Sequence, residues 1–309
     1  MPASTQRTAA IETTRRCLIT GSTGYVGSRI KHALEADGWH VTELNRKARF
    51  SSNMLRFQLG EAIAPEKLAD HSALIHCAYD FRQISWGDIT AVNVRGSELL
   101  LRAASQAGVK QIVFISSISA YDGCRSLYGR AKLEIERITA PLGGWVIRPG
   151  LVYGDAPGAV FGRLVEKVRK SKFIPLPGGS RQRQYLVHDA DLCAVVCRCV
   201  QSEKPACAEP VTVAHDKVWT FRELLLEIGR SMGKEVCFVP VPWRLVWAGL
   251  RLGEKLHLPL QFRSDSLVSL VHQNANPAFN SFETVGVKCR SFDSGKLAAA
   301  NPPPGTSRL

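Results

Sequence analysis

The chain has 309 residues, of which 45% are hydrophobic and 22% are charged. These values are typical of a globular protein with a substantial core, and no apolar run is long enough to span a membrane. Residues 1–14 are polar and lack the apolar core of a signal peptide, so we expect a cytoplasmic protein. Nine cysteines without paired C-x-x-C spacing argue against a disulfide framework and against a metal site.

The formal net charge is +13, and nearly half of this excess lies between Phe161 and Arg183. This basic block has two explanations, which are a solvated helix face and a site for an anionic substrate. No basic groove with interleaved aromatic residues and no DNA-binding motif is visible, so we expect no nucleic-acid partner. The block contains Arg163, Lys167, Arg169, Lys170, Lys172, Arg181 and Arg183, with Glu166 as its one acid.

A glycine-rich turn follows the first predicted strand, Cys17 to Thr20, and precedes a predicted amphipathic helix, Ser28 to Asp37. A strand, a glycine turn and a helix in this order are typical of a dinucleotide site. Gly21 allows the tight turn, Gly24 lets the backbone approach the pyrophosphate, and Gly27 lets the helix pack closely on the strand. The residues expected at the dinucleotide are Gly21, Thr23, Gly24, Tyr25, Val26 and Gly27.

The second predicted strand, Trp39 to Leu44, ends in Asn45-Arg46-Lys47. An acidic residue at this tip would accept hydrogen bonds from the adenosine ribose of NAD, whereas a neutral residue followed by basic ones suits the extra phosphate of NADP. Asn45 and Arg46 therefore favour NADP over NAD. A solvated arginine at a strand end is the alternative explanation.

Strand and helix alternate along the next part of the chain, which predicts an α/β fold with a Rossmann-like, doubly wound parallel sheet. Ligands of such sheets bind at the carboxyl ends of the strands, where Gly21, Ala78 and Ser117 are expected. The predicted elements are strands at Ala73 to Ala78 and Gln111 to Ser117, with a helix at Ile89 to Ala107 between them.

A helical stretch from Leu127 to Glu136 places Tyr128 and Lys132 on one face, one turn apart. Tyrosine has a pKa of about 10, but a nearby ammonium favours the phenolate. Tyr128 can then exchange a proton with a substrate hydroxyl while a nicotinamide exchanges hydride with the same carbon. Ser117 would hold the substrate oxygen and Lys132 would also reach the nicotinamide ribose. The alternative is an ordinary surface helix.

The composition changes after a sixth predicted strand, Trp145 to Tyr153. We expect a dinucleotide-binding domain over residues 16–153, which residues 184–205 rejoin. A smaller C-terminal substrate-binding lobe would consist of residues 154–183 and 206–290. Residues 1–15 are expected to form a mobile tail and 291–309 a C-terminal tail.

One stretch of the lobe, Trp243 to Leu252, is basic and amphipathic. We expect this helix to pack within the lobe. Contact with a membrane surface is the alternative.

Taken together, these motifs resemble the extended short-chain dehydrogenases, the NAD-dependent epimerase/dehydratase family. The resemblance covers residues 16–290 and is specific because the motifs follow the family's order. It implies that Ser117, Tyr128 and Lys132 are catalytic and that Asn93 supports them. It also implies a possible homodimer through the helices at 89–107 and 128–139. The matching motifs are Gly21 to Gly27, His76-Cys-Ala78, Asn93-Val-Arg-Gly96, Ser116-Ser117 with Tyr121, Tyr128-Gly-Arg-Ala-Lys132 and Arg148 to Gly154.

Two departures from the family pattern bear on the reaction. Family dehydratases usually carry acids just after the catalytic serine, whereas Ile118-Ser-Ala120 follows here, which disfavours elimination of water. Many nucleotide-sugar members carry Asn three residues after the Arg that matches Arg148, and this chain has Leu151. Sugar ketoreductases of the family also lack that Asn.

We therefore expect an enzyme, an NADP-preferring oxidoreductase or epimerase acting at a carbinol or keto carbon of a nucleotide sugar, an anionic small molecule. One alternative is an NADPH-dependent ketoreductase of a non-nucleotide carbonyl. Another is a regulator that senses NADP without chemistry. The joint presence of Ser117, Tyr128 and Lys132 argues against the regulator, because a sensor needs only the glycine turn.

Overall fold

The computed structural model of the chain describes residues 15–47, 53–154, 158–179, 182–202, 209–258, 260 and 262–295. Residues 1–14 and 296–309 of the expected tails, and Arg181 of the basic block, lie outside the described residues. Among the described helices, none has the length and apolar character needed to cross a membrane.

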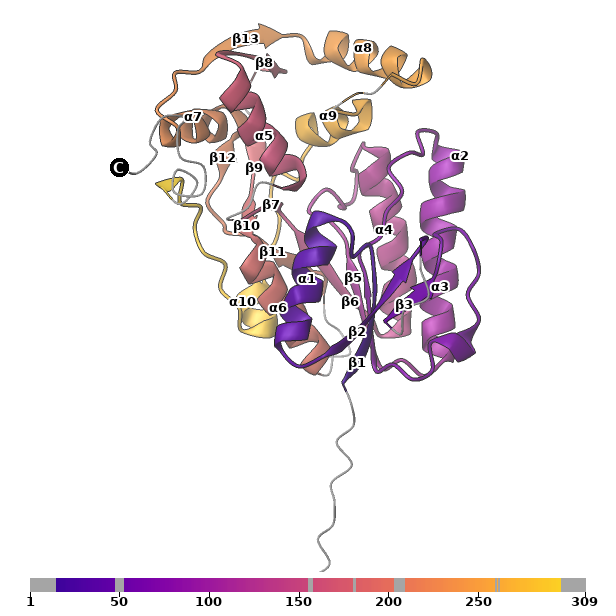
Figure 1. Ribbon diagram of the computed structural model, residues 1–309. Coiled ribbons are helices and arrows are strands. Elements are labelled where there is room, and N and C mark those ends of the chain that lie inside the picture. The colour runs from indigo at the N-terminus through magenta and orange to yellow at the C-terminus, as the bar shows by residue number, and fades with distance from the viewer. Residues whose placement is uncertain are drawn as a thin grey trace, which may run out of the picture.

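Seven parallel strands form the main sheet in the order β11-β6-β5-β4-β1-β2-β3, which confirms the predicted Rossmann-like fold (Figure 1). The strand order reverses between β1 and β4, and sheets of this kind bind ligands at the carboxyl ends beside that point. The strands are β1 (Arg16–Thr20), β2 (His40–Asn45), β3 (Met54–Arg56), β4 (Ala73–His76), β5 (Gln111–Ile115), β6 (Trp145–Pro149) and β11 (Val211–Val213).

Helices cover both faces of this sheet, with α1 packed beside α6 on one face and α3 beside α4 on the other (Figure 1). Neighbouring side chains of each strand alternate between two cores, so Ile19 belongs to the α1–α6 side and Leu18 to the other. The helical segments are α1 (Tyr25–Ala36), η1 (Pro65–Lys67), α2 (Trp86–Ile89), the π-helical turn η2 (Thr90–Val94), α3 (Arg95–Gln106), α4 (Leu127–Thr139), η3 (Ala140–Leu142) and α6 (Asp189–Gln201).

Several element boundaries differ from the expected ones. Helix α1 begins at Tyr25, three residues before the predicted start, because Gly24 is its N-cap. The predicted strand over 145–153 is divided at Gly150 into β6 and β7. Gly150 lies so close to Tyr185 that a Cβ on it would be 2.4 Å from the Tyr185 backbone oxygen. The predicted helix over 89–107 begins earlier, at Trp86, and contains the π-helical turn.

The remaining strands form three two-stranded sheets outside the main one. The sequence predicts that residues 184–205 rejoin the main domain. This is wrong for strand β10, which pairs with β7 outside the main sheet. Helix α6 of the same stretch does pack on the main sheet. The assignment of all of 206–290 to the lobe is wrong for β11, which pairs with β6. These strands are β7 (Leu151–Tyr153), β8 (Phe173–Pro177), β9 (Arg183–Gln184), β10 (Leu186–His188), β12 (Trp219–Thr220) and β13 (Cys237–Val241).

The lobe has an apolar core of its own, formed mainly by α5, α7 and strands β7, β8 and β10. Two further helices, α8 and α9, pack together, and α9 contacts α4 of the main fold. The lobe therefore reaches the helix expected to carry Tyr128. The last helices are α5 (Ala159–Lys170), α7 (Phe221–Ser231), α8 (Trp243–Lys255), α9 (Ser264–Val271) and α10 (Ser281–Val285), and α10 packs on α6.

Candidate active site

The glycine turn between β1 and α1 has no room for side chains at two positions. Gly21 has a φ of +70° and would place a Cβ 2.9 Å from the Ala78 nitrogen, and a Cβ on Gly27 would lie 2.2 Å from the Gly21 oxygen. Gly24 and Thr23 are exposed at the tip of the turn, while Val26 packs against the core below. The turn thus presents an open backbone cradle, with the start of α1 behind it.

A buried polar chain joins the ends of β1 and β4. The Thr20 hydroxyl lies 2.7 Å from His76 Nδ1 and accepts hydrogen bonds from the backbone nitrogens of Cys77 and Ala78 at 3.1 Å. His76 Nε2 lies 2.7 Å from the Ser97 hydroxyl. Burial, reinforced by the charge of Lys132, lowers the pKa of His76 to about 3, so this ring is neutral at physiological pH.

Glu43 fixes the glycine turn from below, a role that sequence reasoning missed. Ser22 of the turn and Lys31 of α1 both donate to its carboxylate at 2.5 Å. Burial alone would raise the pKa of Glu43, but the hydrogen bonds from Lys31 and Ser22 outweigh it, and the pKa is lowered. The carboxylate therefore stays charged and holds β2, the turn and α1 together.

The expected adenosine end lies at the carboxyl end of β2. The Asn45 side chain accepts a hydrogen bond from the backbone nitrogen of Lys47 at 3.0 Å. Arg46 follows it and is exposed. The structure thus leaves the Arg46 guanidinium accessible beside the strand end.

Tyr25 connects the glycine turn to the start of helix α6. Its hydroxyl donates to Asp189 at the start of α6 at 2.8 Å, and Arg29 contacts the same carboxylate at 3.1 Å. Gly154 and Gly158 lie against Tyr25 so closely that a Cβ on either would overlap its side chain. The chain after β7 is therefore held beside the expected cofactor loop.

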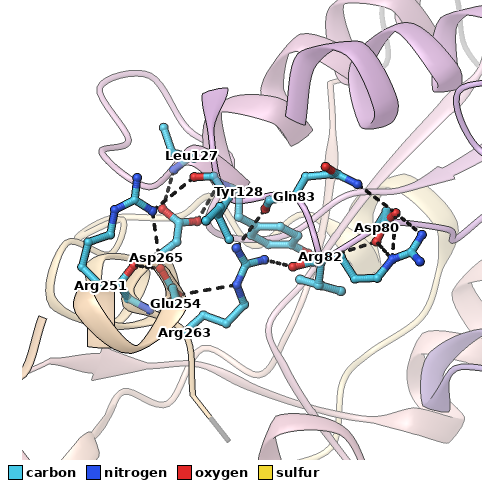
Figure 2. A network of polar contacts seen from close by, with 12 residues as sticks. Asp80, Arg82, Gln83, Leu127, Tyr128, Arg251, Glu254, Arg263 and Asp265 are labelled. Atoms are coloured by element: carbon cyan, nitrogen blue, oxygen red, sulfur yellow. Dashed lines mark hydrogen bonds and ion pairs between the residues drawn. The ribbon is translucent and has the colours of Figure 1, made fainter. Parts of the chain in front are cut away.

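The start of α4 is fixed by two acceptors. The Ser126 hydroxyl accepts from the Gly129 nitrogen at 3.1 Å, and the Asp265 carboxylate of α9 accepts from the nitrogens of Leu127 and Tyr128 at 2.7 and 2.9 Å (Figure 2). Acceptors at these positions satisfy free donors of the first helical turn. Sequence reasoning missed Asp265, because 137 residues separate it from Tyr128.

Ser117, Tyr128 and Lys132 come together between β5 and α4. Gly129 makes this possible, because a Cβ there would lie 2.3 Å from the Ser119 oxygen. The pKa of Tyr128 is raised to about 12, because the effect of burial is larger than the opposite effect of its hydrogen bond with Ser117. The Lys132 ammonium donates to the Ile115 oxygen at 2.7 Å and lies 5.8 Å from the Tyr128 ring centre. In the protein alone, Tyr128 is thus a protonated phenol at neutral pH.

Burial lowers the pKa of Lys132 from its ordinary 10.5 to about 8. The buried ammonium therefore destabilises the fold fully below pH 8, and this penalty disappears as the pH rises toward 10.5. The pKa difference corresponds to about 3 kcal/mol, part of which the lost bond to Ile115 offsets. We expect Lys132→Met to raise the free energy of unfolding at pH 7 by about 1–3 kcal/mol. Denaturant titrations of both proteins should converge near pH 10, and an unchanged difference there would contradict this assignment.

Two aromatic rings from the loop after β4 cover Tyr128. The Tyr79 ring packs edge-on at 5.0 Å and the Phe81 ring stacks at 5.7 Å from the Tyr128 ring. Neither residue was singled out by sequence reasoning. They give Tyr128 an apolar, aromatic border.

Asn93 is buried in the π-helical turn and acts on this same loop. Its side-chain oxygen accepts from the Asp80 nitrogen at 2.6 Å, and its amide donates to the Asp80 oxygen at 3.1 Å. Both bonds fix the backbone between Tyr79 and Phe81. Asn93 therefore supports the site through the loop, and π-helical turns are frequent at functional sites.

The lobe holds the far end of this loop (Figure 2). Arg263 donates to the backbone oxygens of Phe81 and Gln83, and Arg251 of α8 donates to Ile84 at 3.3 Å. Glu254 lies next to both arginines, within 3.4 and 3.8 Å. The α8–α9 pair thus contacts both the loop that covers Tyr128 and the helix that carries it.

An ion pair between a partly buried Arg148 and a buried Glu136 joins β6 to α4. Arg148 of β6 donates to both Glu136 oxygens, at 2.9 and 2.5 Å, and the Ser116 hydroxyl donates to the same carboxylate. We expect Arg148→Met to lower the free energy of unfolding by about 3–5 kcal/mol, because Glu136 keeps a buried charge without its partner. Denaturant unfolding measures this. The double variant Arg148→Met, Glu136→Leu should recover most of the loss, and additive losses would argue against the pairing.

A parallel sheet whose reversal point holds a glycine cradle, with serine, tyrosine and lysine gathered beside it, defines a dinucleotide-dependent α/β enzyme. The chain belongs to the NAD dependent epimerase/dehydratase family, whose model matches residues 17–213. This confirms the resemblance found in the sequence.

Individual relatives agree with this membership. A UDP-glucose 4-epimerase from Vibrio cholerae is 27% identical over 73% of this chain and 78% of its own length. A ceramide reductase from Caulobacter vibrioides is 24% identical over 72% and 73% of the two chains. The fold is shared with MoeE5, solved with UDP-glucuronic acid and NAD, with a TM-score of 0.71, 18% identity and coverage of 92% and 96%.

Proposed function

We propose that the protein is an NAD(P)-dependent oxidoreductase or epimerase that transfers hydride at a carbinol or keto carbon of a nucleotide sugar. The observation that carries the proposal is the set of Ser117, Tyr128 and Lys132, of which Lys132 is buried and the other two are partly buried, at the same sheet edge as the glycine cradle. The Vibrio cholerae relative is a UDP-glucose 4-epimerase, and MoeE5 holds a UDP-sugar acid together with NAD.

The glycine turn fits a dinucleotide, because a Cβ at Gly21 or Gly27 would collide with the backbone that shapes the cradle. The bound nicotinamide would supply or accept the hydride. Tyr128, protonated at neutral pH, donates its proton to the substrate oxygen in reduction, and Ser117 orients that oxygen. In oxidation Tyr128 must be a phenolate, which the Lys132 ammonium favours below pH 8. Asn93 and Asp265 keep the parts aligned.

Elimination of water is not part of the proposal. Ile118, Ser119 and Ala120 follow Ser117, so the segment offers no carboxyl group for proton removal. Hydride transfer with proton exchange at one oxygen needs none.

Arg46 supports a preference for NADP. We expect Arg46→Ala to weaken NADPH binding about 10- to 100-fold, because a hydrogen bond to a charged phosphate contributes about 1.5–3 kcal/mol. NADH binding should stay within a few-fold of the wild type. Fluorescence titration with both dinucleotides measures the effect, with Arg102→Ala on the exposed side of α3 as the control. Equal weakening for NADH and NADPH would show that Arg46 does not select the phosphate.

The basic block supports an anionic substrate only in part. Arg169 and Lys170 pair with Glu166 at 3.1 and 3.0 Å, which matches the explanation of a solvated helix face. Arg163 is exposed and lies over the Phe262 ring at 5.8 Å. It is the residue of the block that we propose for contact with an anionic substrate.

A second candidate, a reductase of a non-nucleotide carbonyl, is favoured by the aromatic border of Tyr128. Phe81 is 55% exposed beside this ring and could pack on an apolar substrate. Leu151, in place of the usual Asn, joins the lobe core. The Caulobacter relative is a ceramide reductase.

Thermal-shift measurements separate the two candidates. A ligand that binds only the folded protein stabilises it by about 2.7 kcal/mol at a hundred times its Kd. The first candidate predicts stabilisation by at least one of UDP, dTDP and GDP in the presence of dinucleotide. Absence of stabilisation across all three would overturn it. Turnover of a lipid-like ketone with NADPH would then support the second.

We also propose a cytoplasmic location and a homodimer. The eight cysteines in the described part of the chain are unpaired thiols, which supports a reducing compartment such as the cytoplasm. Homodimer formation through α3 and α4 stays a prediction.

A further inference from the structure

We propose that one edge of the lobe, formed by α8 and the β8–β13 pair, docks on the surface of an anionic lipid bilayer. We call this the docking edge. Figure 1 shows its three elements together along the end of the molecule away from β1. The proposal goes beyond the catalytic function and is independent of it.

The β8–β13 pair turns an apolar surface outward. The strands are parallel, with Phe173 opposite Cys237 and Pro175 opposite Val239. Paired residues share a face, and the alternate residues of β8, Ile174 among them, point into the lobe core. Phe173 is 65% exposed and Val239 is 46% exposed. Four residues of low polarity therefore make up the outer face.

Helix α8 continues this surface, since Pro242 alone separates it from β13. Leu245, Leu252 and Leu256 are 68%, 59% and 61% exposed, and their spacing of seven and four residues places them on one side. The opposite side packs on α9. One side of this helix thus packs within the lobe, as expected, and the leucine side is exposed.

The charges on α8 match an anionic surface. Arg244 and Lys255 are exposed beside the leucine stripe. The one acid of the helix, Glu254, is turned inward, where it accepts hydrogen bonds from Ser264 at 2.7 Å. A helix side with exposed Leu, flanking Arg and Lys and no exposed acid has the composition of helices that lie in the membrane interface.

The surrounding sequence adds positive charge. Residues 166–179 and 234–258, which contain the docking edge and the segments that lead into it, hold eight Lys and Arg against three Glu. Four of the eight pair with those three acids, so the excess is five positive charges. Each basic residue near an anionic membrane contributes about 1 kcal/mol of attraction. A depression of about 410 Å³, lined by Val241, Trp243 and Arg244 among others, lies between β13 and α8. This depression connects the end of β13 with the start of α8 and includes one basic residue, Arg244.

Docking at this edge would place the bilayer next to the lobe elements that reach the active site. Arg251 projects from α8 to the backbone of Ile84, in the loop that covers Tyr128. A substrate with an apolar tail could then enter from the membrane. This consequence rests on the second candidate function, whereas the docking itself does not.

The test is flotation of the full-length protein with vesicles of phosphatidylglycerol and phosphatidylcholine, compared with phosphatidylcholine alone. We expect at least tenfold stronger binding to the anionic vesicles, weakened by salt. The double variant Leu245→Glu, Leu252→Glu should lose at least tenfold, and Arg244→Ala, Lys255→Ala should lose the preference for anionic lipid. Phe282→Glu on α10, 60% exposed and outside the docking edge, is the matched control and should bind like the wild type.

Dinucleotide binding shows that each variant is folded. The proposal is overturned if the wild type does not float with anionic vesicles, or if the double leucine variant floats equally well. Loss of binding in Phe282→Glu to the same extent would also overturn it. If the wild type instead dimerises in solution without binding vesicles, and the double leucine variant is monomeric, the edge is an interface between two copies. Turnover measured without vesicles tests the proposed function separately.

Discussion

Replacing Tyr128 with Phe is expected to reduce turnover by about 10²- to 10⁴-fold, the usual contribution of a positioned acid or base. The loss should fall on kcat, because the phenol transfers its proton only as the substrate reacts. The Phe ring keeps the packing against Tyr79 and Phe81, so folding and dinucleotide binding should be nearly unchanged. Steady-state kinetics on a substrate found in the ligand screen measures the effect.

Tyr153 provides the matched control for this variant. Its hydroxyl donates to the Ser291 oxygen at 3.3 Å, within the lobe core. Tyr153→Phe should lower stability by about 1 kcal/mol and leave kcat within a few-fold. If Tyr128→Phe and Tyr153→Phe were equally active, Tyr128 would not be the proton donor.

Gly27→Ala is expected to abolish measurable dinucleotide binding and to destabilise the fold by several kcal/mol. The new Cβ would lie 2.2 Å from the Gly21 oxygen and 3.1 Å from the Ser22 nitrogen, both part of the rigid turn. Relief requires α1 to move away from β1, which opens the cradle. Fluorescence titration with NADPH and denaturant unfolding measure the two effects.

Gly249→Ala in α8 is the control, because its Cβ would meet nothing within 4 Å. Alanine in a helix interior is favoured over glycine by about 0.5–1 kcal/mol, so this variant should be as stable as the wild type or slightly more stable. Retained dinucleotide affinity in Gly27→Ala would mean that the turn does not bind the pyrophosphate.

The main fold could be predicted from local signals. The strands around Ile19 and Ile75 are short apolar runs bounded by turns, and their alternation with amphipathic helices fixes a parallel sheet. Beyond Gly154 the strands are only two to five residues long, and their pairing depends on distant partners such as β7 with β10. No local pattern specifies such pairings, which is why β10 and β11 were assigned wrongly.

The candidate site was predictable where its residues share a motif. Tyr128 and Lys132 lie one turn apart, and the structure places Ser117 beside them. Asp265 and Arg263 act on the same site from a helix far along the chain, and a lone acid or arginine in a lobe has no spacing that signals its partner. Glu43 was missed because a charged residue within a strand is usually predicted to face solvent. In the structure it is buried, and Ser22 and Lys31 donate hydrogen bonds to its carboxylate.

The central claim is that this chain transfers hydride between a bound dinucleotide and a nucleotide sugar, while Tyr128 exchanges the proton of the substrate oxygen. The most direct measurement is to mix the wild type, loaded with oxidised NADP or NAD, with a panel of nucleotide sugars and to follow two signals. These are the fluorescence of reduced nicotinamide, which an oxidoreductase produces, and the appearance of an epimer by chromatography, which an epimerase produces. We expect at least one sugar to produce one of these two signals with the wild type, and Tyr128→Phe to reduce its rate at least 100-fold. An equal signal from both proteins, or none from the wild type with any sugar, would contradict it.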